Sequence, residues 1–259
     1  MKEGLKIRGL SLSFAGLKAL EDVSFDVPPG AIVGLIGPNG AGKSSLLNCL
    51  SRLYTPNQGQ LRYQGVDLLE QPVHGLASLG IMRTFQNLEM FPEASALDNV
   101  LTGSLFRHRV GLLPQLLTLP RARRAHARAR REARAFLGQV ALEHLADTPV
   151  GELAFGTQKN IELARALAGR PSLLLLDEPA AGMNPQESQW LGERIRRIRD
   201  ELATSVLLVE HDMRLVMSVC EHIVVLVQGR KVFEGTPAEV RCHPLVIEAY
   251  LGEEEHAAA

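Results

Sequence analysis

A glycine-rich segment of the sequence has the residue types and the spacing that bind phosphate groups. Residues 37–44, Gly-Pro-Asn-Gly-Ala-Gly-Lys-Ser, fit the pattern G-x-x-x-x-G-K-[ST], with a continuous apolar run before them and a helical pattern after them. Glycine lets backbone N–H groups turn toward phosphate oxygens, and the N-terminus of a helix adds partial positive charge at the same place. We expect Lys43 to reach the β and γ phosphates of a nucleoside triphosphate and the Ser44 hydroxyl to bind Mg²⁺.

Two acidic residues, Asp177 and Glu178, directly follow the apolar run at 173–176. A strand ending there places both carboxylates at the carboxyl edge of an α/β sheet, where such sheets bind ligands. We expect Asp177 to hold Mg²⁺ through its water shell, and Glu178 to accept a proton from the attacking water or to orient it. A capped helix start explains Asp-Glu-Pro equally well when the segment is taken alone. The sequence contains no Asn-Lys-x-Asp and no Asp-x-x-Gly after residue 44, which favours adenine over guanine.

Strand and helix patterns alternate along most of the chain, as in a mainly parallel α/β sheet. Alternating or apolar runs predict strands at residues 5–7, 10–14, 23–27, 31–36, 59–63, 79–83, 173–176, 205–209 and 223–227. Continuous apolar runs such as 31–36 predict strands that are buried on both faces, and residues 43–53 have a helical pattern. After position 83, about seventy residues with helical periodicity predict an inserted helical subdomain. A hairpin turn is expected at 228–230, a short helix at 237–250 and a frayed tail at 253–259.

Composition excludes several classes of protein. The chain has 259 residues and a net charge of −1, so it is long enough for one large domain or two small ones and provides no overall field for nucleic acid. No apolar run approaches the roughly 20 residues that cross a bilayer. The charged start lacks the apolar core of a secretory signal, which predicts a cytosolic chain. Cys49, Cys220 and Cys242 are too scattered for a disulfide framework or a C-x-x-C metal site, so we expect reduced and mostly packed thiols.

An arginine-rich stretch stands out within the predicted helical insert. Residues 121–136 contain seven arginines among alanines, with Glu132 as the one acidic residue. A solvated helical hairpin is the favoured interpretation. Docking onto a partner protein or onto anionic lipid headgroups is the alternative, and nucleic acid is disfavoured because no aromatic residues interleave with the arginines for stacking.

Further segments give the sequence a resemblance to ATP-binding-cassette (ABC) ATPases, and within them to the ATP-binding subunit of branched-chain amino acid importers. The matching segments are Phe14 in residues 14–20, Gln86 in Arg-Thr-Phe-Gln, the loop at 178–185 and His211 in Val-Glu-His-Asp-Met. The subfamily match rests on the sequences at 180–185, 210–213 and 249–253. Taken singly, Phe14 is more often a core residue of an edge strand, and Gln86 and His211 are more often surface or capping groups.

The resemblance implies an α/β fold of the P-loop NTPase (RecA-like) type. It has a parallel-sheet core, an N-terminal antiparallel β subdomain and an inserted α-helical subdomain. The implied nucleotide-binding core covers 1–87 and 158–236, the insert with its signature segment 88–157, and the C-terminal helix and tail 237–259. The implied site comprises the catalytic residues Glu178, His211 and Gln86; the nucleotide-binding residues Phe14, Gly37, Asn39, Gly40, Gly42, Lys43, Ser44, Ser45, Asp177, Ala154 and Gly156; and the Mg²⁺-binding residues Ser44, Gln86 and Asp177.

The signature segment departs from the superfamily pattern. The usual Leu-Ser-Gly-Gly-Gln is here Leu-Ala-Phe-Gly-Thr-Gln at 153–158, so Ala154 replaces a serine that donates a hydrogen bond to the γ phosphate. Losing a bond to a charged group costs about 1.5 to 3 kcal/mol. Gly156 and a helix expected from Thr157 to Leu167 retain backbone N–H groups for the phosphate. Since two such subunits sandwich two ATP molecules head to tail, a weakened signature predicts unequal sites and a heterodimer with a related ATPase, with a homodimer as the alternative.

The resemblance implies an ATP-hydrolysing subunit of an importer that takes up branched-chain or other hydrophobic amino acids. ATP and Mg²⁺ are the implied cofactors. The implied partners are a second ABC ATPase, membrane permeases and, indirectly, a periplasmic or extracellular solute-binding protein; no nucleic acid partner is expected. The chain would be cytoplasmic and peripheral on the inner face of the cell membrane. The alternatives are the same machinery for urea or short amides, a soluble cassette ATPase acting on nucleic acid, and a stand-alone P-loop kinase.

Overall fold

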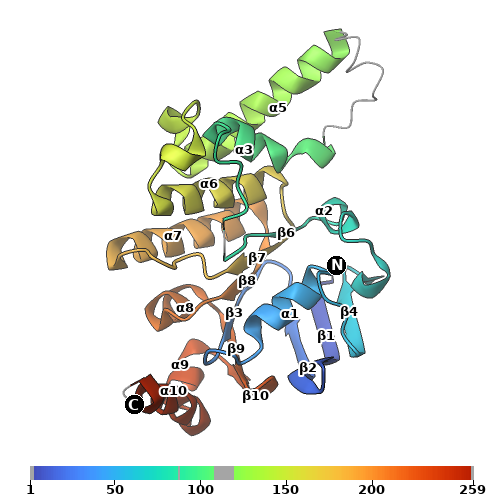
Figure 1. The fold of residues 1–259 in the computed structure, drawn as a ribbon, viewed down its shortest axis with the longest axis vertical. Coiled ribbons are helices and arrows are strands. Elements are labelled where there is room, and N and C mark those ends of the chain that lie inside the picture. Colours follow the sequence, from blue (N-terminus) through green and yellow to red (C-terminus); the bar gives the residue numbers. More distant parts are fainter. Residues whose placement is uncertain (1–2, 87, 108–119, 258–259) are drawn as a thin grey trace. The chain divides into compact units, whose positions relative to one another are not determined.

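The computed structural model describes residues 3–86, 88–107 and 120–257, and the chain divides into two compact units (Figure 1). The core unit comprises Met1–Leu76 and Leu173–Ala259, and the helical unit comprises Ala77–Ser172. The helical unit covers a longer stretch of sequence than the predicted insert at 88–157. It also includes the strand before that segment and the helix after it. The assignment of segments to nucleotide binding stays a prediction.

A four-stranded antiparallel sheet forms the N-terminal part of the core unit. Its strands are β1 (Leu5–Phe14), β2 (Leu17–Val27), β4 (Gln58–Tyr63) and β5 (Val66–Asp67), in the order β2-β1-β4-β5. The predicted strands at 5–7 and 10–14 form one strand, β1, whose register with β2 shifts between Ile7 and Leu10. Gly9 lies at this irregularity with a positive φ of 58°, which explains why the alternating pattern breaks there.

A second sheet carries the buried core of the same unit. In it β10 (Arg230–Gly235), β9 (His222–Val227), β3 (Ile32–Ile36), β8 (Ser205–Val209) and β7 (Leu173–Asp177) lie side by side in that order. The pairs β9–β3, β3–β8 and β8–β7 are parallel, and β10 is antiparallel to β9. Every residue of β3, β7 and β8 is buried, as their continuous apolar runs predict.

Five described helices lie wholly within the core unit; four follow strands and the last follows another helix. They are α1 (Lys43–Leu50), α7 (Pro185–Leu202), α8 (Met213–Val219), α9 (Pro237–Cys242) and α10 (Pro244–Ala257), with a 3₁₀ turn, η1, at Leu68–Glu70. Helix α1 ends three residues earlier than its pattern predicts, because Arg52 is left-handed (φ 61°) and the N–H groups of Leu53 and Tyr54 bond back to the Asn48 carbonyl oxygen.

The C-terminal segment differs from the single short helix and frayed tail that the sequence predicts. Two helices form, and the second, α10, starts at Pro244 and continues through Ala257. Proline fits the first turn of a helix and is disfavoured farther inside, so Pro244 separates the two. The tail prediction was wrong for residues 253–257, which belong to α10; residues 258 and 259 lie outside the described part of the chain.

In the described part of the helical unit, α3 (Ala96–Thr102), α5 (Pro120–Gln139) and α6 (Phe155–Ala168) pack against one another. The other described elements of this unit are β6 (Ile81–Arg83), η2 (Leu105–Arg107), η3 (Glu143–Leu145) and η4 (Val150–Glu152), and α2 (Gly75–Ser78) spans the start of the unit. The arginine-rich stretch forms one helix instead of the predicted hairpin. Ala133 and Leu137 of α5 are buried together with Val100 and Ile161, so this helix is anchored by an apolar face.

The three cysteines are free, as predicted, and two of them are buried. Burial raises the pKa of the Cys49 thiol to about 11 and that of Cys220 to about 12, while Cys242 is exposed. Among the described residues, none of the helices has the length and apolar character needed to span a bilayer.

Candidate functional site

The glycine-rich segment forms the turn between β3 and α1. Gly37 (φ 151°) and Gly42 (φ 101°) both have backbone conformations that favour glycine. A Cβ atom on Gly37 would lie 2.1 Å from the carbonyl oxygen of Leu226, and one on Gly42 would lie 2.6 Å from that of Ala19. Both positions therefore require glycine for close approach of the neighbouring backbone as well as for conformation.

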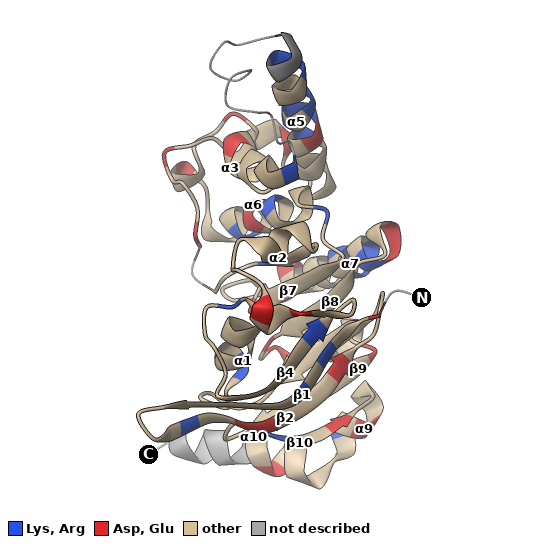
Figure 2. Cartoon of the chain, turned by 90° about the vertical axis from the view of Figure 1, so that its right-hand side faces the viewer, with Lys and Arg blue, Asp and Glu red and all other residues tan. Residues whose placement is uncertain are grey.

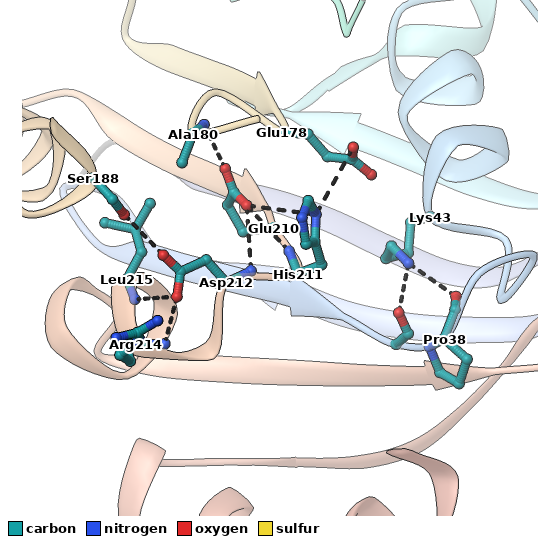
Figure 3. A network of polar contacts seen from close by, with 11 residues as sticks. Pro38, Lys43, Glu178, Ala180, Ser188, Glu210, His211, Asp212, Arg214 and Leu215 are labelled. Atoms are coloured by element: carbon teal, nitrogen blue, oxygen red, sulfur yellow. Dashed lines mark hydrogen bonds and ion pairs between the residues drawn. The ribbon is translucent and has the colours of Figure 1, made fainter. Parts of the chain in front are cut away.

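The Lys43 ammonium group lies inside this turn (Figure 3). Its side chain is buried, and Nζ donates hydrogen bonds to the carbonyl oxygens of Gly37 and Pro38, the latter at 2.9 Å. Ser44 is exposed and Ser45 half-buried in the first turn of α1. The turn is thus a cationic, glycine-rich cradle at the N-terminus of a helix, which is an arrangement that binds phosphate.

The two acids occupy the end of β7 and the loop after it. Asp177 is buried and lies opposite Val209, the last residue of the neighbouring strand β8. Glu178 is left-handed (φ 47°), and its N–H donates to the Val209 carbonyl oxygen at 2.9 Å. Non-glycine residues held in this conformation are strained and are frequent at functional sites. The alternative of a helix capped at Asp177 is not observed, because α7 begins at Pro185 with Asn184 as its N-cap.

His211 follows β8 and lies beside Glu178 (Figure 3). Its Nδ1 is 3.9 Å from Glu178 Oε2 and 3.9 Å from Glu210 Oε2. The His211 side chain is 61% exposed, whereas that of Glu178 is 18% exposed. The imidazole therefore lies between two carboxylates, beyond hydrogen-bond distance of both, and remains open to solvent.

Glu210 is a residue of the site that the sequence reasoning missed. Its side chain is fully buried; Oε1 accepts a hydrogen bond from the Ala180 N–H at 2.7 Å, and Oε2 accepts one from the His211 N–H at 3.1 Å and one from the Asp212 N–H at 3.5 Å. Burial raises the pKa of the Glu210 carboxyl, and the backbone donors partly oppose this effect. Glu210 thus joins the loop that carries Glu178 to the loop that carries His211. An acid directly after the predicted strand at 205–209 was the signal available in the sequence.

Asp212 makes a second connection between the same two regions. It is the N-cap of α8 and accepts hydrogen bonds from the N–H groups of Arg214 and Leu215. It also accepts one from the Ser188 hydroxyl in the first turn of α7 at 2.9 Å. Asn184 caps α7 in a capping box with Glu187, which fixes where the loop after Glu178 ends.

Gln86 lies in the helical unit, after β6, where α6 holds its backbone. The Lys159 ammonium donates to the carbonyl oxygens of Phe85 at 3.2 Å and Gln86 at 2.8 Å, and the Phe85 N–H donates to Glu162 Oε1 at 2.9 Å. Lys159 and Glu162 are both buried. A buried lysine and a buried glutamate of one helix therefore fix the backbone on which the Gln86 side chain is mounted.

The signature segment forms the N-terminus of α6. The helix begins at Phe155, two residues before the predicted start at Thr157, so that expectation was wrong. Ala154 takes the N-cap position, whose carbonyl accepts from the Gln158 N–H at 3.0 Å, and its methyl group forms no capping hydrogen bond. Gly156 lies in the first turn, where helix N–H groups lack intrahelical partners. These N–H groups are the donors that the sequence analysis assigned to a phosphate.

Phe14 lies at the end of β1 and is 44% exposed, so it is not a core residue. Its ring meets that of Tyr54 edge to face, with centroids 5.1 Å apart. Phe14 pairs with Leu17 across the turn between β1 and β2. Strand β2 also contains Ala19, whose carbonyl oxygen lies close to Gly42. An exposed aromatic ring is therefore available on the strand pair that borders the glycine-rich turn.

Within the core unit the structure places the glycine-rich turn, the acid pair and His211 after β3, β7 and β8, which are adjacent parallel strands. Gln86, Ala154 and Gly156 belong to the helical unit. In the described part of the chain, no group of three or more His, Cys, Asp or Glu side chains forms a ready metal site. The Ser44 hydroxyl and the Asp177 carboxylate are hard oxygen donors, and this small set fits Mg²⁺, which takes few protein ligands and completes its shell with phosphate and water.

Comparison with known proteins agrees with this geometry. The ABC transporter family matches residues 20–181, and the family described as branched-chain amino acid ATP-binding cassette transporter matches residues 230–256. The high-affinity branched-chain amino acid transport ATP-binding protein BraF of Pseudomonas aeruginosa is 42% identical over 96% of this chain and 98% of its own length. The corresponding protein LivG of Escherichia coli K12 is 40% identical with the same coverage.

Solved structures are similar along nearly the whole chain. A nucleotide-free ATP-binding cassette of an ABC transporter has a TM-score of 0.83 at 28% identity, covering 96% of this chain and 98% of that one. The ADP conformation of the cassette MJ1267 has a TM-score of 0.84 at 28% identity, covering 97% and 100%.

Fold and turn together define a P-loop NTPase, with the α/β architecture that the sequence predicts. The family match covers more than half of the chain, so this chain belongs to the ABC transporter family and is an ATP-binding ATPase whose activity serves transport. The predicted resemblance to branched-chain amino acid importers is confirmed.

Proposed function

We propose that the chain is the ATP-hydrolysing subunit of an importer for branched-chain or other hydrophobic amino acids. The observation that carries this proposal is the similarity to BraF and LivG along the full length, together with the subfamily match at residues 230–256. That match lies in β10, α9 and α10, outside the phosphate cradle, so it adds information that a P-loop alone does not contain. Uptake of urea or short amides by the same machinery is the second candidate.

The core unit would bind ATP through its cradle and its exposed aromatic ring. Lys43 would exchange the carbonyl oxygens of Gly37 and Pro38 for β and γ phosphate oxygens, to which a full negative charge binds it more strongly. Phe14 would stack on adenine, while Asn39, Gly40 and Ser45 line the cradle. Mg²⁺, held by Ser44 and Asp177, would neutralise phosphate charge when bound.

Glu178 and His211 would act on the water that attacks the γ phosphate. The Glu178 carboxylate accepts or orients its proton, and His211, 3.9 Å away, contacts the γ phosphate or Glu178 by rotating about its side-chain torsions. Gln86, mounted on the backbone that Lys159 and Glu162 fix, would respond to Mg²⁺ and the attacking water from the helical unit.

Two such subunits would enclose two ATP molecules head to tail, so that the signature segment of each serves the cradle of the other. Ala154 lacks the serine hydroxyl, which costs about 1.5 to 3 kcal/mol at the partner's ATP. We infer a heterodimer with a related ATPase, in which ATP at Lys43, Asp177 and Glu178 is hydrolysed rapidly and ATP opposite Ala154 slowly. Closure of the dimer would drive the membrane permeases, and product release would reset them. The chain would lie on the inner face of the cell membrane through these permeases and would receive solute indirectly from a solute-binding protein.

The proposal is tested by reconstituting the chain with candidate permeases and a second ATPase in vesicles. We expect leucine uptake that requires ATP and that stops with Glu178→Gln, whose hydrolysis rate falls by about 10² to 10⁴ because a general base is lost while ATP binding is retained. Glu193→Gln, an exposed acid on α7, is the matched control and should change neither rate. ATP-dependent uptake of urea but not of leucine would contradict the assigned solute, and hydrolysis without any uptake would contradict the importer.

A further inference from the structure

One face of helix α5 carries exposed arginines. Arg124, Arg128 and Arg131 are exposed and are spaced at i, i+4 and i+7, so they share one side of the helix. The buried side chains of α5, among them Ala129 and Ala133, lie on the opposite side. Figure 2 shows the basic residues as repeated blue bands along α5. The apolar contacts of the helix therefore leave its arginine side turned to solvent.

Acidic side chains of the helical unit do not neutralise this face. Glu132, the one acid on α5, lies within 4 Å of three guanidinium groups: Arg128 at 3.0 Å, Arg170 at 3.5 Å and Arg107 at 3.9 Å. One carboxylate cannot balance three cations, and the pKa of Arg107 is lowered by burial and then by repulsion from Arg170. The positive excess is therefore concentrated where α5, η2 and the end of α6 meet.

Two other arginines of α5 are paired with acids and are not part of this face. Arg130 lies 3.0 Å from Asp98, and Arg134 lies 3.4 Å from Asp147. Helix α5 thus separates a flank of paired arginines from a face of excess charge. The chain as a whole has a net charge of −1, so the excess is local.

The composition of the face indicates what it contacts. Phe136 is the one Phe, Tyr or Trp residue on α5 and it is buried, so bases of single-stranded nucleic acid have no large aromatic ring to stack on along the described part of the helix. Ala127 lies between Arg124 and Arg128, and the three arginines of α5 form a row along the helix. Beside it in η2, Leu105 is 57% exposed next to Arg107. Arginines beside an exposed leucine are typical of surfaces that meet the charged and apolar layers of a membrane.

We propose that this surface, the α5 arginine face (Arg107, Arg124, Arg128, Arg131 and Arg170), binds the anionic headgroups of a phospholipid membrane. The guanidinium groups would donate paired hydrogen bonds to lipid phosphates, and a row along one helix matches a flat array of headgroups better than a single bound anion. The subunit would then be held at the membrane by lipid headgroups as well as by the permeases. It is independent of which solute is transported.

The test is sedimentation of the purified full chain with phosphatidylcholine vesicles that contain or lack phosphatidylglycerol. We expect binding only to the anionic vesicles, and weaker binding as salt rises, because exposed charges are screened. Each arginine near an anionic surface strengthens binding about fivefold, so Arg124→Gln, Arg128→Gln and Arg131→Gln together should weaken it by on the order of a hundredfold.

A matched triple variant keeps the test specific. This control combines Arg62→Gln, Arg197→Gln and Arg241→Gln, which remove the same charge from exposed positions on β4, α7 and α9. We expect the control to bind anionic vesicles more tightly than the α5 triple variant does, with an affinity nearer that of the parent. Circular dichroism of both variants checks that they fold. Equal loss in the two variants, equal binding to neutral vesicles, or displacement of the vesicles by a short single-stranded oligonucleotide would overturn the proposal. These measurements need neither ATP nor permease, so their failure is distinct from failure of the proposed transport function.

Discussion

At the scale of single residues, the site depends on carboxylates with different surroundings. Asp177 ends a buried strand, Glu178 is held in a strained backbone conformation, and Glu210 is fully buried between two loops. The first two were predicted from the sequence because their order after an apolar run is a motif. Glu210 was not, because its importance depends on Ala180, thirty positions away in the chain, and no local pattern encodes that contact.

Replacing Glu210 with glutamine should weaken the connection between the two loops. A carboxylate accepts hydrogen bonds through both oxygens, whereas the amide NH₂ of glutamine accepts none, so either the Ala180 N–H or the N–H groups of His211 and Asp212 lose a partner. Leaving a buried donor unsatisfied costs about 1 to 3 kcal/mol, to be measured by denaturant unfolding. Glu201→Gln, an exposed change on α7, should cost almost nothing. An unfolding free energy equal to that of the parent would contradict the role assigned to Glu210.

The folding stability of the parent and that of Glu210→Gln should depend differently on pH. The folded-state pKa of Glu210 is raised above the unfolded value, so between these two values the folded state holds a proton that the unfolded state has released. Stability of the parent therefore falls as pH rises through that window, beginning near the ordinary glutamate pKa, and is flat above it. Glu210→Gln lacks this titration. The stability of the parent minus that of Glu210→Gln should decline with rising pH across the window, and a difference that is constant or rises would contradict the shift.

Thiol reactivity gives a further test at this scale. Cys49 and Cys220 are buried and have raised pKa values of about 11 and about 12, whereas Cys242 is exposed at the end of α9. A maleimide should label Cys242 in the native protein at neutral pH and the other two only after unfolding, because the thiolate is the reactive form. Peptide mass spectrometry before and after denaturation measures this. Early labelling of Cys220 would mean that α8 opens in the native state.

At the scale of elements, sequence patterns located the strands better than the helix ends. Buried parallel strands consist of apolar runs bounded by polar residues, and β3, β7 and β8 lie where those runs are. Helix ends depend on backbone conformation and caps: Arg52 stops α1 by adopting a left-handed conformation, and α6 begins at Phe155 without a capping side chain. Helix α5 is anchored by packing on α3 and α6, which joins residues far apart in the chain. No local pattern encodes that packing, so the sequence analysis predicted a hairpin there instead of one helix.

Restoring a cap should stabilise α6. Ala154 already has N-cap geometry (φ −60°, ψ 148°), so a serine hydroxyl in Ala154→Ser could accept a hydrogen bond from the N–H of Thr157 without moving the backbone. We expect a gain of about 1 kcal/mol in the free energy of unfolding, within a range of about 0.5 to 2. Ala135→Ser, an exposed position inside α5, is the control and should be slightly destabilising because serine is a poorer helix former. Equal changes in both variants would show that Ala154 is not a capping position.

At the scale of the whole molecule, the departure at Ala154 predicts unequal catalysis in the assembled transporter. Glu178→Gln in this chain should remove most of the ATPase activity of the complex, while the corresponding change in the partner ATPase should leave most of it intact. Ala154→Ser should raise the activity that remains after Glu178→Gln by about ten- to a hundredfold, the equivalent of the missing hydrogen bond. Steady-state phosphate release measures all three. The reverse pattern of the two glutamine variants would mean that the rapid and slow sites are exchanged.

The shape that the glycine-rich turn already has affects how fast nucleotide binds. The backbone at Gly37 and Gly42 already has the shape of a phosphate receptor, so little backbone entropy remains to be lost when a ligand arrives, and Lys43 only exchanges its two carbonyl partners for phosphate oxygens. The association rate of nucleotide should therefore be limited by diffusion to a preorganised binding site. Substitutions in the glycine-rich turn that change affinity should change mainly the dissociation rate.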